Sequence, residues 1–261
     1  GVYGSTLIKT PNLDRMALNG ARFDSFYSSA NICTAARGGL LTGRYPIRLG
    51  LVNDVARPTN DIHLAEEEIT IAEALQPLGY RTGLFGKWHL GDEQAYLPRQ
   101  RGFDEVLMHG SGGIGQFIYG DFKENSETPY FDNVLLQNDT VVRTKGFCTD
   151  LFFRAAMAWI NRQHAAKKPF FAYIPLNAAH GPWVLPEAYY QHYLGKAGVS
   201  EDVAKFFGMI ENIDTNFGVL LTKLKAWGIE NNTLVIYLGT DNGGFAEACK
   251  IFNAGMRGSK V

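Results

Sequence analysis

Apolar residues along the chain follow two spacings, one typical of helices and one typical of buried strands. Over residues 10–17, a threonine that can cap a helix precedes Pro11, and apolar residues then recur at helical spacing until Gly20. Residues 170–176 and 233–238 are instead almost continuously apolar. Such runs are expected in strands that helices cover on both faces, so we predict an α/β protein.

The rest of the chain alternates between these two kinds of segment. We predict helices over residues 66–78, 150–164 and 201–227, and further strands over residues 21–27 and 81–85. Residues 110–143 are rich in glycine and polar side chains, with a hairpin predicted around residues 137–140. We interpret this stretch as an irregular excursion at the rim of a functional site.

Composition and charge are those of an ordinary globular protein. The chain has 261 residues, 46% of them hydrophobic, with 25 basic against 26 acidic side chains. This balance gives no reason to expect a nucleic-acid partner. No apolar run approaches the roughly 20 residues of a membrane-spanning helix. The three cysteines, Cys33, Cys148 and Cys249, form neither a CxxC pair nor a disulfide-dense pattern.

Cys33 and Arg37 lie at the start of a helix predicted from Thr34. Residues four apart share one face of a helix, so both side chains would face the same volume. The N–H groups at a helix start and the helix dipole together favour a bound oxyanion or sulfate ester. Taken alone, Cys33 has a plainer interpretation as a buried small apolar residue.

Polar side chains follow three of the predicted strands. They are Lys87 and His89 after residues 81–85, His180 after residues 170–176, and Asp241 with Asn242 after residues 233–238. Ligands of α/β sheets bind at the carboxyl ends of strands, so these residues are candidates for one site. Singly, each has a plainer alternative: a surface lysine, a loop histidine or a common Asp-Asn-Gly-Gly turn.

These segments, in this order, resemble the motifs of the sulfatases. Cys33-Thr34-Ala35-Ala36-Arg37 is similar to the family's Cys-x-(Pro/Ala)-x-Arg modification motif, and residues 86–91, Gly-Lys-Trp-His-Leu-Gly, match a second motif without a mismatch. Residues 177–183, 239–244 and 257–260 resemble three more. The resemblance covers almost the whole chain and implies the alkaline-phosphatase-like fold, a large, mostly parallel central sheet with helices on both faces.

The resemblance implies hydrolysis of a sulfate monoester. Cys33 would be oxidised to formylglycine, whose hydrated aldehyde is the nucleophile. His89 would take the proton from the hydrated aldehyde that expels sulfate, and His180 would bind sulfate and protonate the leaving alcohol. The implied catalytic residues are Cys33, Arg37, Lys87, His89, His180 and Lys260, of which Arg37 and the two lysines bind sulfate.

The resemblance also implies a divalent cation, Ca²⁺ or Mg²⁺. Asp241 and Asn242 offer the oxygen ligands that such ions prefer, with the modified Cys33 as a further ligand. Sulfatases complete this site with adjacent aspartates on a first strand, and the chain has no Asp-Asp pair. We expect that strand to precede Gly1, so residues 1–261 are interpreted as one catalytic domain that is incomplete at both ends.

Two alternatives stay open at this point. One is a phosphonate or phosphodiester hydrolase of the same superfamily, against which the GKWHLG segment and the two lysines favour sulfate. The other is a catalytically silent glycan-binding relative in which Cys33 stays a thiol.

Substrate, partners and location are further expectations. The resemblance implies a formylglycine-generating maturation enzyme as a partner. It also implies export to the periplasm, the secretory route or the lysosome. We expect a sulfated carbohydrate as the substrate. Candidates to line its pocket are Tyr96, Tyr130, Trp183 and the excursion of residues 110–143.

Overall fold

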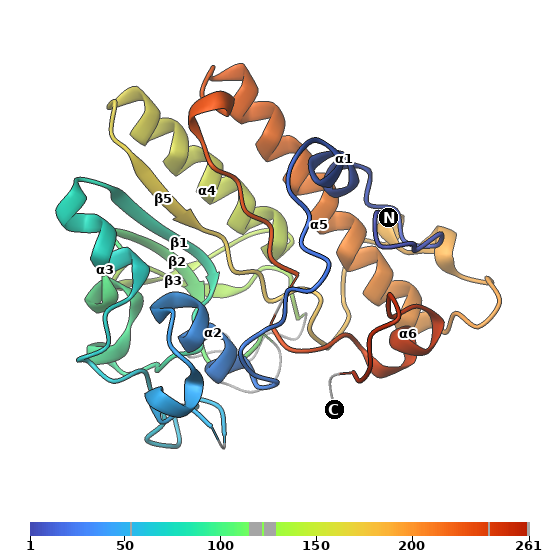
Figure 1. Ribbon diagram of the computed structural model, residues 1–261, viewed down its shortest axis with the longest axis horizontal. Helices are drawn as coiled ribbons and strands as arrows, with labels where there is room; N and C mark the ends of the chain where they lie inside the picture. Colours follow the sequence, from blue (N-terminus) through green and yellow to red (C-terminus); the bar gives the residue numbers. More distant parts are fainter. Residues whose placement is uncertain (53, 115–121, 123–128, 240, 260–261) are drawn as a thin grey trace. The chain divides into compact units, whose positions relative to one another are not determined.

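A computed structural model describes residues 1–52, 54–114, 122, 129–239 and 241–259 (Figure 1). These residues form two compact units, one of residues 28–177 and one of residues 1–27 with 178–261. No helix within the described ranges is both long and apolar enough to cross a bilayer.

The unit of residues 28–177 is built on a five-stranded mixed sheet. Its strands are β1 (Arg81–Lys87), β2 (Glu105–His109), β3 (Val134–Gln137), β4 (Thr140–Arg143) and β5 (Phe170–Tyr173), in the spatial order β4-β3-β2-β1-β5. β1 pairs in parallel with β2 and β5, and the pairs β2–β3 and β3–β4 are antiparallel. The α/β prediction is therefore confirmed, with the parallel part of the sheet centred on β1.

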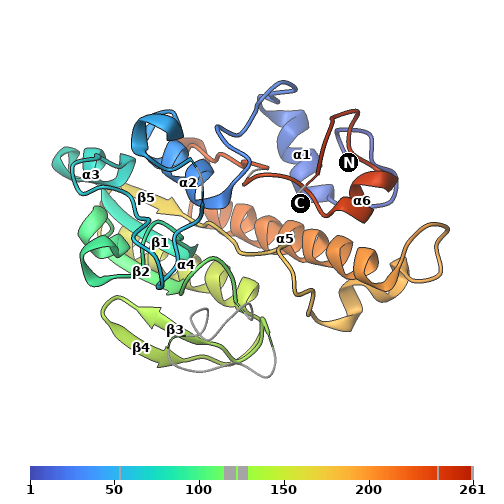
Figure 2. The ribbon, with the colours of Figure 1, turned by 90° about the horizontal axis from the view of Figure 1, so that it is seen from below.

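Helices of this unit cover both faces of the sheet (Figures 1 and 2). They are α2 (Cys33–Thr42), α3 (Ile71–Leu75) and α4 (Cys148–Ala165), with the 3₁₀ helices η1 (Pro46–Leu49), η2 (Gln76–Leu78), η3 (Gln94–Tyr96) and η4 (Pro98–Arg101). Phe85 of β1 contacts Trp159 of α4, with ring centroids 5.8 Å apart. Leu84 instead lies in a buried cluster with Ala35 of α2 and Ala72 of α3. Because successive strand residues point to opposite faces, this adjacent pair joins the sheet to both helical layers.

The unit of residues 1–27 and 178–261 is helical in its described part. Its helices are α1 (Pro11–Asn19), α5 (Glu201–Ala226) and α6 (Ala246–Ile251), with the 3₁₀ helices η5 (Glu187–Tyr189), η6 (Gln191–Tyr193) and η7 (Glu230–Asn232). A buried cluster joins Tyr193 of η6, Phe207 of α5 and Ala248 of α6. The long helix α5 is thus the element on which the shorter segments of this unit assemble.

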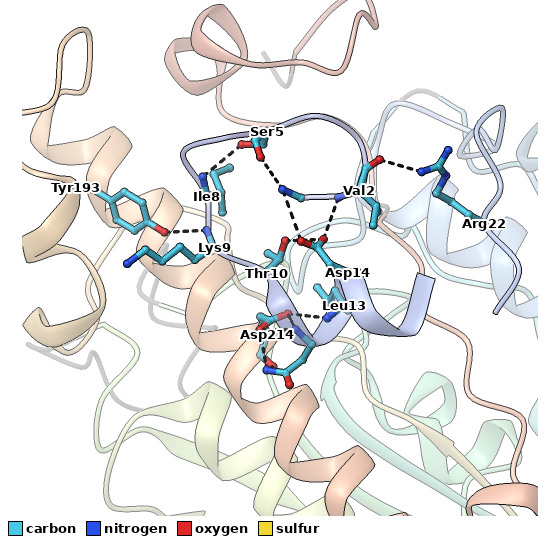
Figure 3. A network of polar contacts seen from close by, with 12 residues as sticks. Val2, Ser5, Ile8, Lys9, Thr10, Leu13, Asp14, Arg22, Tyr193 and Asp214 are labelled. Carbon is cyan, nitrogen blue, oxygen red and sulfur yellow. Dashed lines mark hydrogen bonds and ion pairs between the residues drawn. The ribbon is translucent and has the colours of Figure 1, made fainter. Parts of the chain in front are cut away.

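Asp214 of α5 caps the start of α1 (Figure 3). Its carboxylate accepts hydrogen bonds from the backbone N–H of Asn12 at 3.1 Å and of Leu13 at 2.8 Å, and from the Asn12 side-chain amide at 2.8 Å. Thr10 occupies the N-cap position as predicted, but its hydroxyl donates to Asp14 and does not cap the helix. A carboxylate about 200 residues away therefore satisfies the N–H groups that a local cap would take.

The helix predicted over residues 66–78 is shorter than expected. Thr70 and Glu73 form a capping box, in which Thr70 Oγ1 accepts from Glu73 N–H at 3.2 Å and Glu73 Oε2 accepts from Thr70 N–H at 2.8 Å. The box starts α3 at Ile71, and Pro77 lies in the 3₁₀ turn that follows it. The helices predicted over residues 150–164 and 201–227 and the hairpin around residues 137–140 are confirmed by α4, α5 and the pair β3–β4.

Two predicted strands are wrong and one strand was missed. Residues 21–27 form no strand, and their large side chains are exposed, Phe23 at 73% among them. Residues 233–238 also form no strand, and Leu234 is 86% exposed. A strand is stabilised by its neighbours, and the described part of this unit offers no strand to pair with. The missed strand, β2, is held between β1 and β3.

Candidate active site

Two hydrogen bonds join the first two turns of α2 to the end of β1 and the residues just after it. Thr34 Oγ1 donates to the carbonyl oxygen of His89 at 3.0 Å, and Arg37 Nη1 donates to that of Lys87 at 3.0 Å. Four side chains of these two segments are buried: Cys33, Arg37, Lys87 and His89 are each less than 9% exposed. The structure thus brings four of the predicted site residues together within one unit.

Gly86 allows the end of β1 to lie against the segment that follows β5. The N–H of Lys87 donates to the carbonyl oxygen of Pro175 at 2.6 Å. A Cβ atom at residue 86 would stand only 2.1 Å from that oxygen, and the φ angle of +139° is one that side chains rarely adopt. Glycine is therefore required here for Lys87 to occupy its place.

The start of α2 has the features of an anion site. The helix begins at Cys33, and the N-cap residue Ile32 has no polar side chain with which to cap it. The N–H groups of a first helical turn and the helix dipole attract negative charge. The buried cations Arg37 and Lys87 add to this field, so the site favours an anionic ligand.

His89 is held as a neutral imidazole. Burial, followed by the nearby positive charges of Lys87, Arg37 and His109, keeps the pKa of His89 well below its ordinary value. Its Nε2 lies 3.0 Å from the carbonyl oxygen of Ala56, which can only accept, so Nε2 carries the proton. Nδ1 is buried and has no hydrogen-bond partner in the described part of the chain. His89 can therefore accept a proton at Nδ1.

Thr34, which the sequence did not single out, orients His89. Its hydroxyl donates to the His89 carbonyl at 3.0 Å and accepts from the N–H of Ala56 at 2.9 Å, while Ala56 in turn accepts from the His89 ring. These three residues close a loop of hydrogen bonds beside Cys33. The one available signal was the position of a hydroxyl directly after the cysteine.

His109 is a second histidine that the sequence did not reveal. It ends β2 in register with Lys87, is fully buried, and places Nδ1 2.8 Å from the carbonyl oxygen of Gly110. Because β2 was not predicted, nothing in the sequence placed His109 at the end of a strand. Its charge is one of the causes that lower the pKa of His89.

The remaining predicted residues belong to the other unit or lie outside the described residues. His180 is partly buried, with Nδ1 2.7 Å from the carbonyl oxygen of Gly181. Asp241 and Asn242 are partly buried in an irregular segment. Lys260 lies outside the described residues. That these residues share a site with Cys33 stays a prediction.

Asp241 and Asn242 fit a hard divalent cation in kind, since a carboxylate and an amide each offer an oxygen ligand. They are too few, because Ca²⁺ takes about six to eight oxygen ligands. No group of three His, Cys, Asp or Glu side chains suited to a metal occurs among the described residues. This turn therefore fits as one part of a metal site.

The aromatic candidates for a sugar pocket differ in exposure. Tyr130 is only 1% exposed, and its hydroxyl donates to the Asn177 carbonyl at 3.2 Å, so its prediction as a lining residue is wrong. Burial raises its pKa well above the ordinary value. Tyr96 is partly buried and stacks on His63, and Trp183 contacts Phe245 with ring centroids 4.1 Å apart. Residues 115–121 and 123–128 of the excursion lie outside the described residues.

Comparison with known proteins assigns the family. The sulfatase family model matches residues 1–258. The chain belongs to the sulfatase family. It is 32% identical to mouse (Mus musculus) arylsulfatase J over 266 residues, which cover 100% of this chain and 42% of that protein. It is also 32% identical to N-acetylgalactosamine-6-sulfatase of Rattus norvegicus, covering 93% of this chain and 47% of the relative. This sulfatase chain therefore spans about half the length of these curated relatives.

Solved structures agree with the sulfatase fold. A crystal structure of Ps i-CgsB in complex with k-i-k-neocarrahexaose matches with a TM-score of 0.77 and 27% identity, over 86% of this chain and 51% of that one. The phosphonate monoester hydrolase of Agrobacterium radiobacter shares the fold, with a TM-score of 0.61 and 20% identity, over 89% of this chain and 57% of that one. The alkaline-phosphatase-like fold expected for the family is thereby supported.

Proposed function

We propose that the whole protein hydrolyses a sulfate monoester at the site formed by α2 and the end of β1. The observation that carries this proposal is the pair of hydrogen bonds from the first two turns of α2 to residues 87 and 89. They hold Cys33 at a helix start beside a buried arginine, a buried lysine and a neutral histidine. These side chains together can bind an anionic ester and stabilise the charge that develops when its central atom is attacked.

Each described residue has a task that its contacts support. Formylglycine at residue 33, made by a maturation enzyme, supplies the hydrated aldehyde that attacks sulfur. Arg37 and Lys87 bind the sulfate oxygens, and fixed positive charge of this kind stabilises the transition state. As one hydroxyl of the hydrate bonds to sulfur, the ester S–O bond breaks and the alcohol leaves. His89 then accepts the proton of the remaining hydroxyl at Nδ1, the ring nitrogen other than the Nε2–H that donates to Ala56, so that the aldehyde reforms and sulfate is released. The low pKa of His89 keeps Nδ1 unprotonated at neutral pH.

We propose further tasks for His180 and for Asp241 with Asn242, which belong to the other unit. With Nδ1–H donating to Gly181, a protonated His180 gives its second proton from Nε2 to the leaving alcohol. Asp241 and Asn242 would hold a Ca²⁺ or Mg²⁺ ion with residue 33, and such an ion would supply positive charge against the sulfate oxygens. Lys260 is proposed as a second sulfate-binding lysine. These assignments treat residues 1–261 as parts of one catalytic domain.

We infer a sulfated carbohydrate as the substrate and export as the location of the protein. The names of the relatives support the substrate, since one is an N-acetylgalactosamine-6-sulfatase and one structural neighbour is described with a neocarrahexaose. Export rests on the family resemblance alone.

Phosphonate hydrolysis is the second candidate, because a phosphonate monoester hydrolase shares the fold. Turnover of an aryl sulfate and of an aryl phosphonate by the full-length, matured protein distinguishes the two. We expect a higher kcat/KM for the sulfate. A higher value for the phosphonate would overturn the assignment. Tight binding of a sulfated glycan without sulfate release would support the catalytically silent relative instead.

A further inference from the structure

Asp92 anchors a backbone segment that contacts His89. Its two carboxylate oxygens accept hydrogen bonds from the N–H of Ser111, at 3.0 and 3.1 Å. Asp92 is partly buried, three residues after His89, and Ser111 lies just beyond β2. The interaction thus joins the segment after β1 to the segment after β2.

Gly112, the residue after Ser111, lies against the His89 ring. A Cβ atom at Gly112 would stand 2.6 Å from Cε1 and 2.7 Å from Nε2 of the imidazole. Real Cβ atoms do not approach so closely, so any side chain at residue 112 would displace the ring. Ser111 itself has a φ of +51°, a conformation uncommon for a residue other than glycine. The Asp92 carboxylate satisfies the N–H of that unusual residue.

The His89 ring is therefore restrained from two directions. The Ala56 carbonyl holds Nε2 at 3.0 Å, and Gly112 closes off the space beside Cε1 and Nε2. A ring flip would place a carbon atom opposite the Ala56 carbonyl and turn Nδ1 away from its present direction. Restraint of the ring matters because proton transfer requires a fixed direction of approach.

We propose that Asp92 is a positioning residue: through Ser111 it holds Gly112 against His89 and keeps Nδ1 in place as the proton acceptor. This inference rests on the proposed function, in which His89 acts as the base. Asp92 touches neither the sulfate ester nor the reacting atoms in the proposed reaction.

The free-energy cost of burying the ionised Asp92 carboxylate supports a functional role for this residue. Burial raises the pKa of Asp92 to about 6, against the opposing effect of the Ser111 hydrogen bond. An ionised carboxylate here lowers stability at neutral pH, whereas an uncharged acceptor would not. Costly ionisable groups of this kind are more frequent at functional sites.

The test compares four variants of the full-length, matured protein. Asp92→Ala removes both acceptors, Asp92→Asn keeps one amide oxygen, and Gly112→Ala displaces the ring without changing Asp92. Asp104→Ala is the matched control, because Asp104 accepts from the backbone N–H of Thr82 at 3.1 Å at the opposite ends of β1 and β2. Mass spectrometry of the Cys33 peptide verifies equal maturation of all variants.

For an aryl sulfate, we expect Asp92→Ala and Gly112→Ala to lower kcat by about 10- to 100-fold with little change in KM, the scale of a misplaced catalytic group. Asp92→Asn should retain most of the activity, and Asp104→Ala all of it. Equal kcat values for the wild type and Asp92→Ala would overturn the inference. So would an equal loss in Asp104→Ala.

A second measurement does not depend on turnover. NMR of ¹⁵N-labelled histidine should show one Nε2–H tautomer for His89 in the wild type and in Asp92→Asn. A mixture of tautomers or a mobile ring is expected in Asp92→Ala and in Gly112→Ala. An unchanged His89 spectrum in both would overturn the inference even in an active protein. A wild type with the expected spectra but no sulfatase activity would instead contradict the proposed function.

Discussion

Replacing Thr34 by valine removes the hydroxyl that ties the start of α2 to His89. Valine has nearly the same shape as threonine, so the change removes hydrogen bonds with little change in volume. The buried carbonyl of His89 loses a donor at 3.0 Å, and the N–H of Ala56 loses an acceptor at 2.9 Å. An unsatisfied buried polar group costs about 1–3 kcal/mol, so the two together should lower the free energy of unfolding by about 2–6 kcal/mol.

Urea unfolding of the full-length protein, followed by tryptophan fluorescence, measures this loss. Trp88 lies in the same buried cluster as Ala35 of α2 and reports on it. With an m-value of about 2–3 kcal/mol/M, the unfolding midpoint should fall by roughly 1 M or more. The control Thr34→Ser keeps both hydrogen bonds and should lose only about 1 kcal/mol for its missing methyl group.

The same two variants separate orientation from stability. Thr34→Val should also lower kcat for an aryl sulfate, since His89 loses part of its support, whereas Thr34→Ser should stay close to the wild type. A Thr34→Val protein within about 0.5 kcal/mol of the wild type, the range of a neutral surface change, would refute the argument.

Three further predictions follow from other contacts. Asp214→Ala should lower the free energy of unfolding by about 2–4 kcal/mol, because two N–H groups of α1 lose their charged acceptor, and Asp214→Asn should lower it by about half as much. Equal urea midpoints for the wild type and Asp214→Ala would contradict the capping role. Asp92, with a pKa of about 6 when folded and about 3.9 when unfolded, binds its proton more tightly in the folded state. The free energy of unfolding of the wild type, relative to that of Asp92→Asn, should therefore be greatest below about pH 4. It should fall by about 3 kcal/mol as the pH rises through 6. A difference between the two urea unfolding curves that does not change with pH would refute this prediction. Ca²⁺ at ten times its Kd should stabilise the chelator-treated protein by about 1.4 kcal/mol, seen as a rise in Tm. The rise should be lost in Asp241→Ala, and an equal rise there would exclude Asp241 as a ligand.

Elements with strong local signals could be predicted from the sequence. The helices α4 and α5 carry long periodic patterns, and the hairpin of β3 and β4 turns at Asn138 and Asp139. β2 was missed because its five residues lie between loop-like segments and its order comes from pairing with β1 and β3. Residues 233–238 show the reverse case, since an apolar run forms no strand where the described unit supplies no partner.

The site was predictable where its residues form contiguous motifs. Cys33 with Arg37, and Lys87 with His89, each occur within one short segment, and the structure brings the two pairs together. Thr34 and Asp92 escaped prediction because their partners lie 55 and 19 residues away. Contacts across such distances arise from the packing of α2 and of the loop after β2, which no local pattern encodes.

Mass spectrometry of the tryptic peptide that carries Cys33 measures whether the proposed formylglycine is present. The peptide should come from the full-length protein produced in its own host, so that the maturation enzyme has acted. We predict a mass lowered by the change from CH₂SH to CHO at residue 33. A peptide with an unmodified thiol would contradict it, because the nucleophile of the proposed reaction would then be absent.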